Sequence, residues 1–284
     1  MESPPSINVQ LIARLSANML FQLGSFAPPA VPSSSKLNRI TTTPKGKNMR
    51  EAWNLEELRA QVKIRQPDTN KRLVQIINSL GRSRDIFEYH KCLARDAFTA
   101  FNAENDLHGI KFAERIFGCE DDDGVIYEAG LISEANLIAC IAITRHSYDS
   151  FGQLLNALVV PVPLERNFYI QDVEAALPTG ELKDHLSGAL TSEWFGYTHA
   201  FMNMVKHHQL IVHNASISFI DENRGGKVEG FRHKEKDYPA CWVREALEGT
   251  VELQNSLRAC GVLLNRMYLG EHLAKSAAIS STTE

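Results

Sequence analysis

The pattern of apolar and polar positions from Glu51 onward repeats at helical spacing. Asn54 can cap a helix that carries acidic residues in its first turn, as Glu56 and Glu57 do here. Apolar residues then recur every three or four positions in most of the chain, which predicts amphipathic helices. The predicted helices start at Asn54 and at Asp68 (ending at Gly81), then cover Ser83–Asn105, 110–117, Ser133–Val160, Ile170–Leu177, Glu181–Leu210 and Cys241–Leu269.

The period changes to two between the last two long helices. Ala215–Ile220 alternates polar and apolar residues, and Asp221–Gly226 provides turn residues before the chain extends again. We therefore predict a β-hairpin over about 211–233, with Gly225 and Gly226 in its turn. The expected fold is mainly α, a helical bundle with one β-hairpin inserted before the C-terminal helix.

The first 48 residues differ from the rest. They contain five Lys or Arg and one acid, Glu2, and are rich in Ser, Thr and Pro. Ile7–Phe26 is apolar enough for one short amphipathic helix, and the remainder is typical of a linker. A targeting leader, a dispensable leader and a start of translation at Met49 are all compatible with this composition, and we favour either of the last two over targeting. The expected organisation is a leader (1–48), one helical domain (49–275) and a frayed tail (276–284).

Composition limits the compartment and the partners. The 284 residues have a net charge of −4, so the chain as a whole does not attract nucleic acid, although a local basic patch can. Five Cys without metal-ligand spacing favour small buried side chains in a reducing cytoplasm. The apolar run Ala135–Ile143 is too short for a membrane span and predicts a buried helix. We expect no metal and no cofactor. The acidic run from Cys119 to Gly124 lacks the ligand pattern of a calcium loop, so we expect a solvated turn.

Two segments contain residues suited to acid–base or phosphate chemistry. At the end of the helix that begins at Glu181, helical spacing places imidazole, amide and ammonium side chains on one face. The candidates are His199, Asn203, Lys206 and His207, and His208 and His213 follow them in the chain. A His beside a Lys tends toward a lowered pKa, which suits a general base. The alternative is a polar helix end, where cations are favourable. His146 with Asp149 is more typical of a surface ion pair. Trp194 and its aromatic neighbours are more typical of core packing.

The second segment runs from Arg84 to His90 and carries a resemblance. Arg84, Asp85 and His90 match the Arg-x(4–6)-His pattern of the HEPN superfamily of helical prokaryotic domains, which this chain resembles. The segment Asn203-x-x-Lys206-His207, followed by a hairpin, is similar to poorly characterised bacterial proteins of this type, although Lys replaces Arg there. The resemblance implies RNA as substrate, metal-independent ribonuclease activity and a homodimer. The other hypothesis is a non-catalytic binding or scaffold protein.

Overall fold

The computed structural model describes residues 52–101, 106, 108–118, 123–165 and 167–280, with only the backbone described at 123 and 271–280. These residues belong to one compact unit, Met49–Glu284. The predicted leader, the acidic loop at 119–122 and the residues after 280 lie outside the described residues, so the predictions made for them stay predictions.

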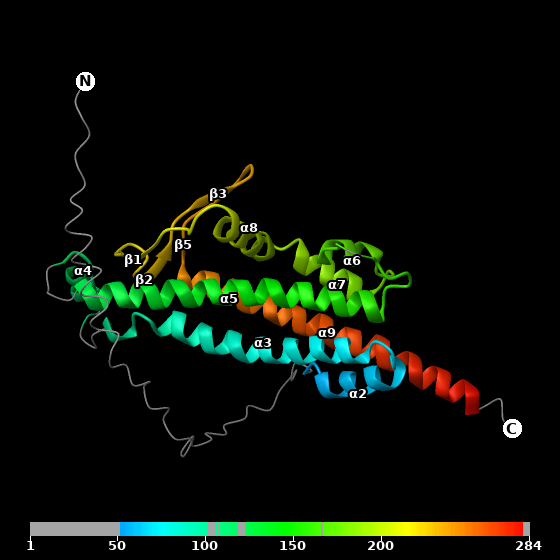
Figure 1. The fold of residues 1–284 in the computed structure, drawn as a ribbon. Helices are drawn as coiled ribbons and strands as arrows, with labels where there is room; N and C mark the ends of the chain where they lie inside the picture. The colour runs from blue at the N-terminus through cyan, green and yellow to red at the C-terminus, as the bar shows by residue number, and fades with distance from the viewer. Residues whose placement is uncertain (1–51, 102–105, 107, 119–122, 166, 281–284) are drawn as a thin grey trace, which may run out of the picture. The chain divides into compact units, whose positions relative to one another are not determined.

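Helices form most of the described chain, so the mainly α prediction is confirmed. In Figure 1, α3, α5 and α9 run beside one another, and α5 packs against both of the others. A 3₁₀ turn, η1 (Thr99–Phe101), follows α3. The α-helices are α2 (Leu55–Arg65), α3 (Asn70–Asp96), α4 (Ile110–Ile116), α5 (Asp123–Leu158), α6 (Ile170–Ala176), α7 (Glu181–Leu190), α8 (Glu193–His207) and α9 (Val243–Ser280).

Several helix ends differ from the predictions: α3 ends at Asp96, α5 begins at Asp123 and α9 ends at Ser280. Two further differences have identifiable reasons. We expected Gly81 to end a helix, but α3 continues through it; a Cβ there would lie 3.2 Å from Leu55 Cδ1, so the missing side chain allows α2 to approach. We expected one helix over Glu181–Leu210, but the chain breaks between α7 and α8. Ser192 caps α8, because its Oγ accepts a hydrogen bond from Phe195 N at 3.2 Å. The predicted cap at Asn54 is confirmed, with Asn54 Oδ1 3.0 Å from Glu57 N.

Two hairpins separate α8 from α9. β1 (His213–Ser218) pairs antiparallel with β2 (Asn223–Val228), and β2 pairs with β5 (Cys241–Trp242). A second hairpin, β3 (Phe231–His233) and β4 (Lys236–Tyr238), was not predicted. The predicted Gly-Gly turn is wrong, because both glycines lie inside β2. A Cβ on Gly226 would lie 2.7 Å from Ser133 Oγ and 2.8 Å from His213 Nε2, so glycine is required by packing.

Two large apolar clusters form the core and share α3, α5 and α9. One joins them to α2, α6 and α7, and the other joins them to α8 and the strands. Phe195 and Tyr197 are buried, which confirms that these aromatics are core residues. Cys140 and Cys260 are buried as predicted, whereas Cys92 is exposed because it lies on the solvent side of α3.

Helix α5 is central to both clusters. By length and composition alone, Gly124–Leu158 is apolar enough to cross a membrane, and 28% of its most apolar window is buried. The core helix of a soluble protein satisfies the same criterion. Residues on α5 that are fully buried among other elements include Leu137, Ile141, Tyr148 and Phe151.

Candidate functional site

The side chains predicted to act together at the end of α8 share that helix but differ in burial. Lys206 and His207 are exposed in the last turn, and His208 is the exposed residue that caps the helix through its backbone N–H to Met204 O at 2.9 Å. Asn203 is half-buried one turn earlier. This arrangement fits the alternative of a basic helix end, where cations face the negative end of the helix dipole.

Arg84 and His90 face different directions on α3. Six residues advance an α-helix by about a turn and two thirds, so the two side chains are about 120° apart around the axis. Arg84 pairs with the neighbouring Asp85 at 3.1 Å in an exposed position. His90 Nδ1 instead lies 2.7 Å from Asn136 Oδ1 on α5. The structure therefore does not bring Arg84 and His90 to one site.

His213 begins β1 and faces the core. Its Nε2 lies 3.1 Å from Ser133 Oγ, and Ser133 is fully buried on α5. Burial lowers the pKa of His213. Its Nδ1 is buried without a hydrogen-bond partner among the described residues. This pair connects the sheet to α5, and the buried Ser133 hydroxyl is inaccessible to a substrate.

His199 lies near basic side chains from two other elements. Its ring centroid lies 6.4 Å from that of His233 on β3, with the planes at 72°. Arg145 on α5 and Lys234 after β3 are close enough to lower its pKa. We call these four residues, His199, His233, Arg145 and Lys234, the basic cluster. It forms where α5, α8 and the β3–β4 hairpin meet.

Arg145 is held in place by the protein core. Its Nη2 donates to Asp149 Oδ1 at 3.3 Å, and its guanidinium lies 5.0 Å from the centroid of the Phe195 ring. The side chain is only 13% exposed. Its Nη1 is buried and has no hydrogen-bond partner in the described part of the chain. The neighbouring His146 contacts Ser150 at 3.3 Å, so the acid at 149 pairs with Arg145 and does not orient an imidazole.

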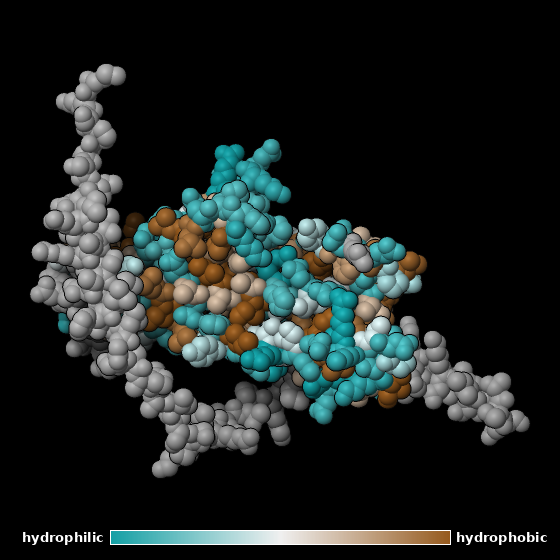
Figure 2. Space-filling model, viewed as in Figure 1, coloured by the Kyte–Doolittle hydropathy of each residue, from teal (hydrophilic) through white to brown (hydrophobic). Residues whose placement is uncertain are grey.

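Aromatic packing fixes the hairpin that carries His233. The rings of Phe231 and Tyr238 stack at 4.9 Å, and both contact Tyr197 on α8 at 5.5 and 5.9 Å. Tyr238 Oη also donates to Gly196 O at 3.3 Å. These contacts hold β3 against α8 and therefore place His233 beside His199. The hairpin turn extends beyond them as a hydrophilic projection (Figure 2).

Lys234 occupies a backbone conformation that is unusual for its type. Its φ is 57°, in the left-handed region where glycine or asparagine is favoured. Such a position costs on the order of 1–3 kcal/mol and is common at functional sites. A lysine at this strained position adds a cation next to His233.

The environment of His199 favours its neutral form. Burial is the largest cause of its lowered pKa, followed by the charges of Arg145, His233 and Lys234, with Asp149 acting in the opposite direction. A neutral imidazole accepts a proton near pH 7, and nearby cations attract an anion. The arrangement is therefore suited to holding a phosphate beside two imidazoles.

Sequence reasoning included His199 but missed the other three residues as its partners. The described residues contain no group of three or more His, Cys, Asp or Glu side chains arranged to hold a metal ion. Comparisons of the chain with protein-family models, curated proteins and solved structures find no match. The site must therefore be interpreted from its own geometry.

Proposed function

We propose that this chain is an RNA-binding protein that holds a backbone phosphate at the basic cluster. The observation that carries the proposal is the convergence of His199, His233, Arg145 and Lys234 from three elements. A cation that solvent can reach is the usual partner of a phosphate oxygen, and Lys234 is the exposed cation of the cluster. Arg145 adds positive charge from a largely buried position. The resemblance to HEPN domains supports RNA as the ligand, and we extend the proposal to a cytoplasmic homodimer.

The pair of imidazoles favours a second function, cleavage of RNA without a metal. His199, neutral because of its lowered pKa, would take the proton of a ribose 2′-hydroxyl, whose oxygen then attacks the adjacent phosphorus. His233 would give a proton to the departing 5′-oxygen. The products would be a 2′,3′-cyclic phosphate and a free 5′-hydroxyl, and the two cations would stabilise the charge on the phosphoryl oxygens.

Binding is tested with labelled single-stranded RNA in EDTA at several salt concentrations. Lys234→Gln should weaken binding and reduce the slope of log affinity against log salt by about one. Lys206→Gln is the matched control, because it removes the same charge from an exposed lysine in the last turn of α8, outside the basic cluster. Equal loss in both variants, or no RNA binding by the unmodified protein, would refute the assignment of the site.

Cleavage is tested on the same RNA by the appearance of a cyclic phosphate end. His199→Ala and His233→Ala should each abolish the product, whereas His207→Ala should retain it. A 2′-deoxy substitution at the cleaved position should block the reaction and preserve binding. Binding without any cleavage would leave the RNA-binding proposal standing and remove the catalytic one.

A further inference from the structure

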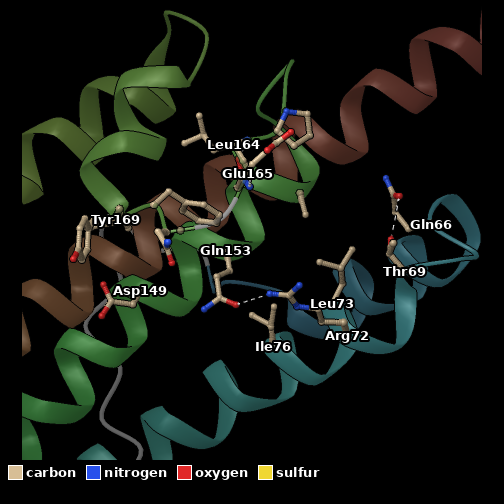
Figure 3. A pocket seen from close by; sticks show the side chains of 17 residues that line it. Gln66, Thr69, Arg72, Leu73, Ile76, Asp149, Gln153, Leu164, Glu165 and Tyr169 are labelled. Atoms are coloured by element: carbon tan, nitrogen blue, oxygen red, sulfur yellow. Dashed lines mark hydrogen bonds between the residues drawn. The ribbon is translucent and has the colours of Figure 1, made fainter.

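A cavity of about 1030 Å³ lies between α3, α5 and the segment that leads into α6 (Figure 3). Its volume is at the upper end of the range for small-molecule sites. Side chains from three separate parts of the chain line it, and the ones used below are Arg72, Asp149, Gln153, Asn156 and Tyr169. Figure 3 shows Asp149 and Tyr169 toward one end and Arg72 facing Gln153 in the middle.

The cavity adjoins the basic cluster along α5. Arg145, Asp149 and Gln153 follow one another at four-residue steps, so they lie on one face of the helix, about 6 Å apart along its axis. Asp149 takes part in both places, because it pairs with Arg145 and lines the cavity. A strand bound at the cluster therefore lies next to the cavity.

The groups in the cavity suit a neutral planar ligand. The Tyr169 side chain is 70% exposed and offers a ring face for stacking. Arg72 Nη2 and Gln153 Oε1 are 3.4 Å apart, a long hydrogen bond that a ligand can replace. Asn156 is already committed, because its amide bonds both N and O of Leu164 and so fixes the wall of the cavity.

The charge of the cavity differs from that of the cluster. Arg72 is opposed by Asp149 and Glu165, so the lining does not favour a second phosphate. An uncharged nucleobase satisfies both requirements, stacking and hydrogen bonding along its edge. Bases in a duplex have their edges paired and their faces covered, so only an unpaired base can enter.

We propose that this cavity binds an unpaired nucleobase of the RNA strand whose phosphate lies at the basic cluster, which makes the protein selective for single-stranded RNA. The inference rests on the proposed function. It adds a separate requirement, because the cluster alone would hold the phosphates of single and double strands alike.

The test compares binding of a fluorescent single-stranded RNA and of its duplex by anisotropy. Tyr169→Ala should weaken binding of the single strand by about fivefold or more, which is the usual minimum for loss of one stacked base, and should leave duplex binding unchanged. Tyr169→Phe should restore it. Tyr127→Ala is the matched control, because Tyr127 is a similarly exposed tyrosine on α5 away from the cavity.

A second pair of variants tests the edge contacts. Arg72→Ala should also weaken only the single strand, and Arg59→Ala is its control, because Arg59 likewise donates to an amide on a neighbouring helix, Asn78 Oδ1, at 2.9 Å. One outcome would overturn this inference alone. In that outcome, binding depends on Lys234, has the same affinity for single-stranded and duplex RNA, and does not change in the Tyr169 and Arg72 variants. No RNA binding by the unmodified protein would overturn the proposed function and this inference together.

Discussion

Replacing Gly249 by alanine should destabilise the protein through the contact between α9 and α8. Trp194 packs on Gly249, and a Cβ there would lie 2.0 Å from its Cδ2. Ordinary contact begins at 3.4 Å, so the ring must retreat by about 1.4 Å or the helices must separate. Trp194 contacts both large apolar clusters, so neither movement is local.

The expected magnitude follows from two opposing effects. Alanine favours the helical backbone over glycine by roughly 0.5–1 kcal/mol. Forcing a side chain into a packed core costs about 1–3 kcal/mol, and removing a buried Trp entirely costs about 3–5 kcal/mol. Because the ring must move by more than 1 Å, the cost of losing the Trp194 contact applies, and subtracting the helix gain leaves a net loss of unfolding free energy of about 2–4 kcal/mol, or roughly 5–15 °C in melting temperature for a chain of this size.

The measurement is urea unfolding followed by circular dichroism, with Gly188→Ala as the control. Gly188 lies in α7 with no atom within 4 Å of a Cβ, so its replacement should stabilise the protein by about 0.5–1 kcal/mol. The two substitutions are chemically identical and should have opposite signs. If Gly249→Ala is as stable as the unmodified protein, Trp194 does not pack on the glycine and the placement of α8 is wrong.

Three further predictions concern packing and pH. Burial lowers the pKa of both His199 and His213, so as the pH falls the unfolded chain binds protons at these residues before the folded chain does. The free energy of unfolding should therefore decline below about pH 6.5, and urea midpoints at pH 7.5 and 5.5 measure this. Gly226→Ala places a Cβ 2.8 Å from His213 Nε2 and should cost about 1–3 kcal/mol in a thermal melt. Arg224→Ala removes the partner, at 3.3 Å, of buried Asp106. Burial raises the pKa of Asp106, but hydrogen bonds from the Lys111 and Phe112 N–H groups and the charge of Arg224 lower it further than burial raises it, so the melting temperature should fall at pH 7 and the difference should shrink only below about pH 4. A difference that grows on acidification would contradict this.

The helices were predictable because their signals are local. The Asn54 cap and the apolar stripes depend on residues within one or two turns, and burial of each stripe then selects the predicted structure. Two glycines were misleading because their signals were also interpreted locally. Gly81 and Gly226 carry the residue type of a helix stop and a turn, but each is required by a contact with a distant residue, Leu55 or Ser133. No local pattern contains that information.

The basic cluster was not predictable because its members are remote in sequence. Arg145, His199 and His233 lie 54 and 34 positions apart, and helical spacing relates a residue only to its neighbours. The hairpin that brings His233 into place turns at Lys234, without the glycine or asparagine that marks such turns. The alternation of Phe231 and His233 before the turn, with Tyr238 after it, was the available signal, and it is short.

The structure also explains which substitutions separate function from folding. Arg145 belongs to the core as much as to the cluster, because it pairs with Asp149, lies over Phe195 and is only 13% exposed. Its removal would leave a cavity and an unpaired acid, so lost RNA binding in such a variant would carry no information about the ligand. Lys234 and Tyr169 are both exposed, and each belongs to only one of the two proposed ligand sites. Variation at these two positions can therefore distinguish a phosphate site, a base site and a surface that binds neither.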